Sequence, residues 1–425
     1  MPDFLRAYRV RITPLSPVHV GSGERVEPFE YVLLGNEVWV LSPVRLLELL
    51  DSADQERYLT ALEGGPFEAR RALAEIAERA DLRPAVAWRA PVGPEFKRYL
   101  ERAFQTGKGE LALRVFPRSL KGPYLPGSSL KGALRTVFLF DQSRKDLQAD
   151  FNEETYAWEG ACDLRWVPEE RDLFPGRWLL TLGQGRIRAP LRLRRPRGRE
   201  KRSAQGVNVR FEARLLRNSH PKRDADILRD PLRTLLVADF GPIGGTELRL
   251  VDVVGSREQP GEPTGIRWLV EVWTEGAVEA DLRFHRGLQA MLEKTARMQG
   301  ARGQCEEDPV PPLPDMDELA AAAYQRYLGL AEEERDFFEK RGLSGAARKM
   351  TAILDAIYGW VDDEGAFKEP LRFPLRLGYG AGEKTIRLAE FIEFEGPRGA
   401  RRIDPVSRKL AEGEPMGWVM VEVLG

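Results

Sequence analysis

Apolar and polar residues alternate along several segments of the chain, as they do in half-buried β-strands. The first such segment, residues 8–12, is followed by Pro14. Two short runs, 30–34 and 37–40, flank Gly35-Asn36, which is typical of a two-residue hairpin turn. The same alternation predicts further strands at residues 207–215, 246–254, 266–273 and 371–377.

Other segments repeat apolar residues every three or four positions, which places them on one face of an α-helix. In residues 128–140 this face consists of Leu130, Ala133, Leu134, Val137 and Phe138. Further helices are predicted at residues 43–50, 66–80, 285–299, 317–340 and 344–358. Because strands and helices intermix, the pattern predicts an α+β fold with antiparallel strand pairing.

The charge of the chain is unevenly distributed. The 425 residues suffice for two or three domains, and their net charge is -1. Residues 186–223 nevertheless hold fourteen Arg and Lys against two Glu, whereas residues 306–339 hold eleven acidic side chains against two Arg. The sequence therefore predicts an acidic helical region able to balance a basic surface.

Composition narrows the class of protein. Two cysteines, Cys162 and Cys305, exclude a disulfide framework and a cysteine-rich zinc site, and three scattered histidines show no ligand spacing. We expect no cofactor and no metal, although a site for Mg²⁺ made of carboxylates alone stays open. No apolar run has the length of a membrane span, and the N-terminus lacks a signal-peptide pattern. A cytoplasmic protein that does not contact a membrane is expected.

Two segments have the composition of exposed connections. Residues 194–206 are too rich in arginine to be buried and predict an arm or hairpin tip. Such an arm can order on a polyanion, but an ordinary solvated loop is the alternative. Residues 300–314 predict a proline-rich linker.

The segment Pro126–Arg135 has the pattern of a helix N-terminus suited to an anion. Ser128 or Ser129 can cap the helix, and Lys131 and Arg135 follow on its polar face, beside the unpaired N–H groups of the first turn. Ser128 stands where a Walker A loop requires Lys, so nucleotide hydrolysis is not expected. The S-x-x-K spacing lacks the S-D-N and K-T-G partners of penicillin-recognising enzymes. A capped amphipathic helix with ordinary surface cations is the alternative.

Two glycine-rich segments are further candidates for close contact with a ligand. The first, Pro17–Glu24, contains His19, a candidate general acid or base for RNA cleavage, but no partner base is visible in the sequence and a structural or RNA-contacting histidine is the favoured alternative. The second, Gly378–Gly382, follows a predicted strand and is flanked by cations. It matches neither a dinucleotide-binding fingerprint nor Walker A, and a tight turn is the alternative.

Taken together, Ser16–Gly23, Pro126–Thr136 and Gly378–Gly382 resemble the RAMP superfamily of CRISPR-associated proteins. Within it, Asp230–Asp239, the late glycine-rich loop and the residues from Asp404 to Trp418 resemble the fifth subunit of the type III-A (Csm) effector complex. No aromatic-rich strand motif of the RNP type is present, so backbone-directed RNA binding is expected rather than base stacking on a sheet. No G-G-D-D motif is present, which argues against the cyclase subunit.

The resemblance implies an α+β chain of two ferredoxin-like, RRM-related domains with helical insertions. We expect an N-terminal domain at 1–160 and a C-terminal domain at 161–425, the latter with the basic arm 194–206 and a helical insertion at about 284–360. The implied function is that of a non-catalytic subunit in antiviral defence. It would bind the 3′-end region of crRNA, support crRNA maturation and contact other Csm subunits, above all the repeated RAMP backbone subunit. A recruited nuclease is a further implied partner.

We expect the three distant glycine- or serine-rich segments to line one phosphate-binding groove, with the arm at residues 194–202 extending it. The predicted RNA-binding residues are His19, Gly21, Ser22, Gly23, Ser128, Ser129, Lys131, Arg135, Arg376, Gly378, Gly380, Gly382 and Lys384. The main alternative is a metal-independent Cas6-like endoribonuclease that uses His19 to process precursor crRNA. A third possibility is an assembly subunit with little RNA contact.

Overall fold

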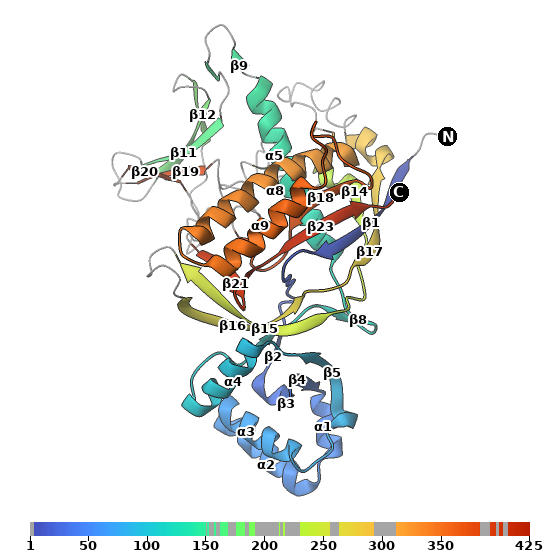
Figure 1. Ribbon diagram of the computed structural model, residues 1–425, viewed down its shortest axis with the longest axis vertical. Coiled ribbons are helices and arrows are strands. Elements are labelled where there is room, and N and C mark those ends of the chain that lie inside the picture. Colours follow the sequence, from blue (N-terminus) through green and yellow to red (C-terminus); the bar gives the residue numbers. More distant parts are fainter. Residues whose placement is uncertain are drawn as a thin grey trace.

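The computed structural model describes a mixed α and β protein (Figure 1). The residues it describes are 4–149, 151–152, 157–158, 162–168, 176–182, 187–191, 212, 216, 230–255, 263–292, 312–382, 392–396, 399–402 and 407–425. None of the helices in these ranges has the length and hydropathy that a membrane-spanning segment requires. The same residues contain no group of three or more His, Cys, Asp or Glu arranged to hold a metal ion.

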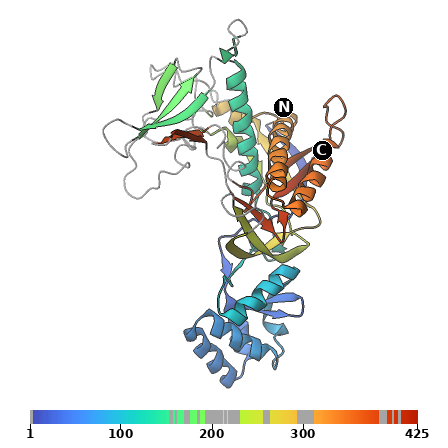
Figure 2. The ribbon, with the colours of Figure 1, turned by 60° about the vertical axis from the view of Figure 1, so that its left-hand side comes forward.

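The central element is a five-stranded sheet, here sheet A, in which all neighbours are antiparallel. Its order is β14 (Leu235–Val237), β17 (Val278–His285), β1 (Leu5–Pro14), β23 (Trp418–Val423) and β18 (Arg372–Arg376). The first and last long strands of the chain are therefore neighbours. One face of the sheet is covered by α5 (Gly127–Ala149) and α8 (Met316–Glu339), which lie side by side (Figure 2). Helix α9 (Ser344–Tyr358) packs on α8.

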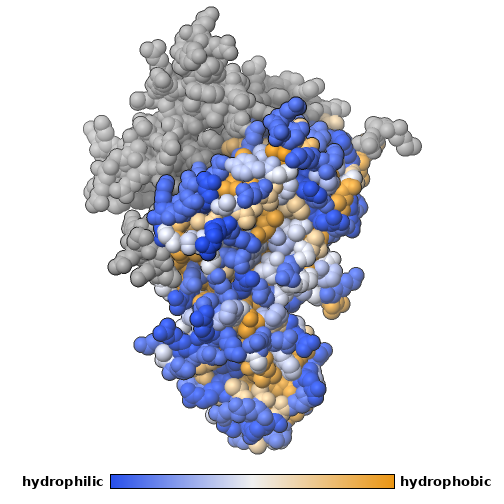
Figure 3. Space-filling view, viewed as in Figure 1, coloured by the Kyte–Doolittle hydropathy of each residue, from blue (hydrophilic) through white to orange (hydrophobic). Residues whose placement is uncertain are grey.

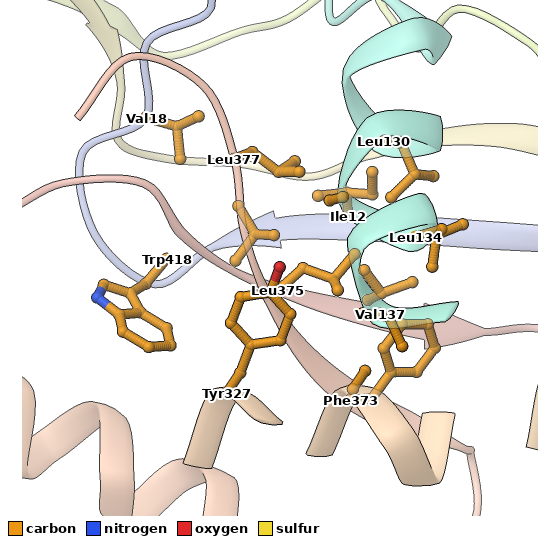
Figure 4. Close-up of a cluster of buried hydrophobic side chains, with 14 of the residues drawn as sticks. Ile12, Val18, Leu130, Leu134, Val137, Tyr327, Phe373, Leu375, Leu377 and Trp418 are labelled. Carbon is orange, nitrogen blue, oxygen red and sulfur yellow. The ribbon is translucent and has the colours of Figure 1, made fainter. Parts of the chain in front are cut away.

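The order of elements in this unit is that of a ferredoxin-like fold. Along the chain β1 is followed by α5, β14, β17, α8 and β23, and in the sheet the corresponding strands stand in the order β14, β17, β1, β23. Apolar side chains of β1, β18, β23, α5 and α8 meet between the sheet and the helices (Figure 4). The predicted α+β class with ferredoxin-like architecture is confirmed. The division between residues 160 and 161 stays a prediction, and sheet A takes elements from both sides of it.

A second sheet, sheet B, supports the candidate site. Its order is β2 (Arg25–Val26), β6 (Leu113–Arg114), β16 (Pro263–Trp273), β15 (Thr246–Gly255), β21 (Ser407–Ala411) and β22 (Glu414–Pro415). One face buries leucines against the N-terminal body, and the other carries a small cluster of Val251, Val270, Val272, Ala411 and Met416. Side chains alternate between the two faces along each strand. A residue two positions from a member of this cluster in the same strand therefore lies on the same face of sheet B.

The N-terminal body lies below sheet B in Figure 1 and is joined to it through the leucine face. It contains η1 (Pro28–Glu30), β3 (Tyr31–Leu34), β4 (Glu37–Leu41), α1 (Pro43–Leu49), α2 (Ser52–Gly64), α3 (Pro66–Ala77), η2 (Arg83–Ala85), β5 (Val86–Pro91) and α4 (Pro94–Thr106). The space-filling view shows mainly hydrophilic side chains over this body, with a smaller apolar area among them (Figure 3). Glu412, at the turn between β21 and β22, accepts a hydrogen bond of 2.9 Å from the N–H of Phe96 and so caps α4.

The remaining described elements are short or lie apart. They are β7 (Arg118–Ser119), β8 (Gly122–Pro123), β9 (Phe151–Asn152), β10 (Ala157–Trp158) and η4 (Pro231–Thr234), and a sheet in the order β13 (Ile187–Leu191), β12 (Gly176–Leu182), β11 (Cys162–Pro168), β19 (Ile392–Gly396) and β20 (Gly399–Arg402). In both ribbon views the strands β11, β12 and β19 lie beside α5, away from sheets A and B (Figures 1 and 2).

Most predicted elements are present. The strands at 8–12, 246–254, 266–273 and 371–377, the hairpin at Gly35-Asn36, and the helices at 43–50, 66–80, 317–340 and 344–358 are confirmed within a few residues. The helix predicted at 128–140 is present but continues to Ala149. The helix expected at 285–299 is helical over 286–292, where the described part ends. Most of the strand at 207–215, the whole arm 194–206 and most of the linker 300–314 lie outside the described residues.

Candidate nucleic-acid interface

The two glycine-rich segments predicted to act together lie in contact. The N–H of Tyr379 donates a 2.7 Å hydrogen bond to the carbonyl oxygen of His19. Gly378 has a φ of +74°, and a Cβ atom there would overlap that same oxygen. The N–H of Gly417 donates to the carbonyl of Pro17 at 2.8 Å. Only a residue without a side chain permits this approach, so Gly378 joins the loop at 378–382 to the segment at 16–23.

His19 is a buried residue at the centre of this contact. Its side chain is buried between the rings of Phe116 and Tyr379, whose centroids lie 5.4 and 6.0 Å from its own. Its Nδ1–H donates a 2.7 Å hydrogen bond to the backbone oxygen of Glu271. Burial, aided by Arg114 and Lys409, lowers the pKa of His19 from 6.5 to about 4, because a charged imidazole would lose its hydration there. The imidazole is therefore neutral at physiological pH.

This burial predicts a pH dependence of stability. In the unfolded chain His19 takes up a proton near pH 6.5, whereas in the folded chain it does so only near pH 4. Its contribution to the free energy of unfolding is therefore complete above pH 6.5 and is lost as the pH falls towards 4. The full difference is about 3 kcal/mol, at 1.36 kcal/mol per pKa unit.

Urea unfolding of the wild type and of His19→Asn between pH 7 and pH 4 measures this contribution. The asparagine amide can retain the hydrogen bond to the Glu271 carbonyl but does not titrate. We expect the two pH profiles to diverge below pH 6.5, with a shallower fall for the variant. Parallel profiles would contradict a neutral buried His19.

Arg376, a predicted RNA contact, is buried and supports the loop from below. Its Nε–H donates to the backbone oxygen of Met416 at 2.9 Å, and its NH2 group donates to Glu334 at 2.8 Å and to the carbonyl of Gly380 at 3.2 Å. Glu334 also accepts a 2.8 Å hydrogen bond from the indole N–H of Trp418. The buried Arg376–Glu334 pair thus connects α8 to the glycine-rich loop. This geometry places Arg376 where it positions the loop.

Beside the loop, four side chains form a cluster of two aromatic rings and two cations, here called the glycine-loop cluster. It consists of Arg114 from β6, Trp268 from β16, Tyr379 from the loop and Lys409 from β21. The rings of Trp268 and Tyr379 meet edge to face with centroids 5.6 Å apart. Lys409 Nζ lies 3.6 Å from the centre of the Tyr379 ring, and the Arg114 guanidinium lies 5.1 and 5.3 Å from the two ring centres.

The charge of this cluster is not balanced. Among the residues that the structure describes, no carboxylate pairs with Arg114 or Lys409, whereas nearby Arg25 lies 3.7 Å from Glu110. Burial lowers the pKa of Lys409, and the positive charges of Arg114 and Arg376 lower it further. Two partly buried cations held together without an acid make a local positive potential. A bound phosphate would relieve it.

The N-terminus of α5, predicted to hold a phosphate, is occupied by a residue of the chain itself. The N–H of Gly127 donates a 2.7 Å hydrogen bond to a carboxylate oxygen of Asp239. A Cβ atom at Gly127 would lie 2.5 Å from the carbonyl oxygen of Val237, so the turn sits directly on this strand. Ser128 is exposed and Ser129 donates its N–H to the carbonyl of Pro126 at 2.9 Å. An anion, the Asp239 carboxylate, already complements this helix end.

The two cations of α5, Lys131 and Arg135, lie close to acidic residues. Arg135 forms ion pairs with Glu212 and, at 3.6 Å, with Asp230. Burial lowers the pKa of Lys131, and the charge of Asp230 raises it in part. Within the described residues, the charge of Arg135 is therefore compensated by carboxylates. The RNA contacts predicted for Ser128, Ser129, Lys131 and Arg135 stay predictions, and Lys384 lies outside the described residues.

The sequence interpretation did not single out Arg114, Trp268 or Lys409. They come from three strands that are far apart in the chain and become neighbours only through the register of sheet B, in which Arg114 stands opposite Val270 and Lys409 opposite Val253. A search for an RNP-type motif could not find them, because that motif requires aromatic residues within one strand. The tyrosine of the predicted loop, Tyr379, was the one available signal.

The order of strands and helices around sheet A defines the protein as a ferredoxin-like α+β protein. A family model described as the RAMP superfamily matches residues 11–247, and the chain belongs to that superfamily. A search of curated proteins found no match.

Solved structures share the fold over almost the whole chain. One is a chain of the cryo-EM structure of a Csm–crRNA–target RNA ternary complex of a type III-A CRISPR-Cas system, with a TM-score of 0.59 and 21% identity over 98% of this chain and 100% of that one. Another is the crystal structure of T. onnurineus Csm5, with a TM-score of 0.55 and 20% identity over 96% of this chain and 99% of that one. The likeness establishes the fold.

Proposed function

We propose that the protein is a non-catalytic, crRNA-binding structural subunit of a type III-A (Csm) RNA-guided effector complex. The observation that carries this proposal is the glycine-loop cluster, in which Arg114 and Lys409 stand beside the glycine-rich loop without an acidic partner among the described residues. Uncompensated cations beside close-packed backbone suit a ribose-phosphate strand. The structural likeness to a chain of a Csm–crRNA–target RNA complex supports the same function.

The proposed partners follow from the resemblance to that complex. The subunit would bind crRNA at its 3′-end region, support crRNA maturation, and contact other Csm subunits, especially the repeated RAMP backbone subunit. It would act in the cytoplasm, and a recruited nuclease would be a further partner. In this proposal Gly21, Ser22 and Gly23 approach the RNA backbone beside Arg114, because Ser22 donates its N–H to the carbonyl of Val115 at 3.3 Å.

The environment of His19 supports a binding function over the Cas6-like alternative. A general base must reach the 2′-hydroxyl that it deprotonates. The His19 side chain is only 2% exposed, and one of its two nitrogens is engaged by the Glu271 carbonyl. A pKa near 4 also makes it a weak base at neutral pH. These features suit a residue that fixes the loop.

Incubation of the purified protein with precursor crRNA in EDTA tests the proposal. We expect the RNA to be bound and to remain intact, with the same result for His19→Asn. Tagged protein should copurify with crRNA and Csm polypeptides, and the crRNA 3′ termini should change when the subunit is omitted. Site-specific cleavage that disappears in His19→Asn would overturn the non-catalytic function. If the tagged protein copurified with Csm polypeptides but without crRNA, the proposed RNA binding would be overturned.

A further inference from the structure

The two rings of the glycine-loop cluster meet on the face of sheet B that carries Val251, Val270 and Val272. Trp268 and Tyr379 meet at an interplanar angle of 77°, and both are partly buried. Trp268 packs on the small cluster of Val251, Val270 and Val272 without being enclosed by it. Aromatic rings that are anchored on one side and accessible on the other are the usual surfaces on which nucleobases stack.

The cations beside these rings are placed where the phosphates of a stacked nucleotide would need them. Lys409 lies over the Tyr379 ring, and Arg114 lies within 5.3 Å of both ring centres. Cation–π contacts hold both charges in position before any ligand arrives. Holding two like charges together is unfavourable, and a phosphate beside them would remove that penalty.

Among the described residues, two exposed backbone segments border the cluster. Gly21, Ser22 and Gly23 are exposed and run alongside β6, which carries Arg114. Near the start of β16, Gly265 is exposed, and a Cβ atom there would have no described neighbour within 4 Å. Exposed backbone therefore borders the cluster beside β6 and in β16, the strands that carry Arg114 and Trp268.

We propose that the glycine-loop cluster binds an unpaired RNA nucleotide, whose base stacks on Trp268 and Tyr379 while adjoining phosphates contact Arg114 and Lys409. This inference rests on the proposed RNA-binding function and extends it, because it requires the bound strand to be single-stranded at this point. In a duplex both faces of each base are covered by neighbouring bases and cannot reach the rings. The site would thus distinguish unpaired from paired bases, in addition to binding the phosphates of the backbone.

The test compares three short probes of equal length: a mixed-sequence single-stranded RNA, its fully abasic ribose-phosphate counterpart, and the corresponding duplex. Binding is measured by fluorescence anisotropy for wild type, Trp268→Leu and Tyr379→Leu. Trp39→Leu is the matched control, because Trp39 is a partly buried strand tryptophan of the N-terminal body. Circular dichroism verifies that each variant is folded.

We expect the wild type to bind the single strand about ten- to a hundredfold more tightly than the abasic probe, the range that base stacking on aromatic side chains provides. Trp268→Leu and Tyr379→Leu should reduce this preference towards unity, whereas Trp39→Leu should retain it. Equal affinity of the wild type for the normal and abasic single strands would overturn stacking while leaving backbone-directed RNA binding intact. Failure of the wild type to bind any of the three probes would instead count against both the stacking site and the proposed function.

Discussion

Replacement of both Arg114 and Lys409 by glutamine is expected to weaken binding of single-stranded RNA by about two to four orders of magnitude. Each side chain would lose a charge-assisted contact to phosphate, which contributes about 1.5 to 3 kcal/mol. The double variant should also show a flatter dependence of log K on log salt, by roughly one to two units, because each neutralised phosphate of a single strand contributes about 0.7. Titrations at several salt concentrations measure both effects.

The two candidate surfaces can be separated with a second double variant. Lys131→Ala with Arg135→Ala removes the cations of α5, where Arg135 already pairs with Glu212 and Asp230. We expect this variant to change the salt slope less than Arg114→Gln with Lys409→Gln does. An unchanged slope in the folded glycine-loop variant, together with a flatter slope in the α5 variant, would move the RNA-binding groove to the helix.

Gly378→Ala is expected to destabilise the protein by about 3 to 5 kcal/mol. Part of this loss, about 1 to 2 kcal/mol, comes from the left-handed backbone conformation, with φ at +74°. The remainder comes from the overlap of the new Cβ atom with the carbonyl oxygen of His19, which the backbone must move to relieve. The free energy of unfolding in urea measures the sum.

Gly413→Ala is the matched control for this prediction. Gly413 also has a positive φ, +86°, but a Cβ atom there would meet nothing within 4 Å. We expect it to cost only the backbone contribution, so the difference between the two variants isolates the contact between the loop and the His19 segment. Equal losses of stability would show that Gly378 is not pressed against His19. A folded Gly378→Ala should also bind RNA more weakly, because the loop carries Tyr379.

Local sequence patterns predicted many of the elements correctly because their signals lie within a few residues. The helix at 344–358 has the predicted bounds, and β15 and β16 agree closely with the predicted strands. Helix α4 was missed although its pattern was available. Gly93 is its N-cap and Pro94 its first residue, Phe96, Leu100 and Ala103 are buried on one face, and Gly107 ends it in a left-handed conformation. Both propensity and periodicity favour this helix, so the local sequence is sufficient to predict it.

The roles of residues in the candidate site could not be predicted from local sequence patterns. Gly378 and His19 were both singled out, but the reason for the glycine, an overlap with a specific carbonyl 359 positions earlier, depends on the tertiary fold. From the sequence, Arg376 is a suitable phosphate ligand. In the structure its guanidinium donates instead to Glu334 and to the carbonyls of Met416 and Gly380. A cation in a sequence carries no sign of whether an acid from another element will neutralise it.

By itself, the sequence determined the α+β class, the glycine-rich segments and the helix at 128–140, because backbone preference and side-chain periodicity act over one or two turns or strands. Only the tertiary structure decided which cations are balanced and which are not. It turned Arg135 and Arg376 towards carboxylates, and it gathered Arg114, Trp268, Tyr379 and Lys409 on one face of sheet B. Charge compensation and ring contacts depend on distances through space, and these are set by strand register and by packing between segments hundreds of residues apart.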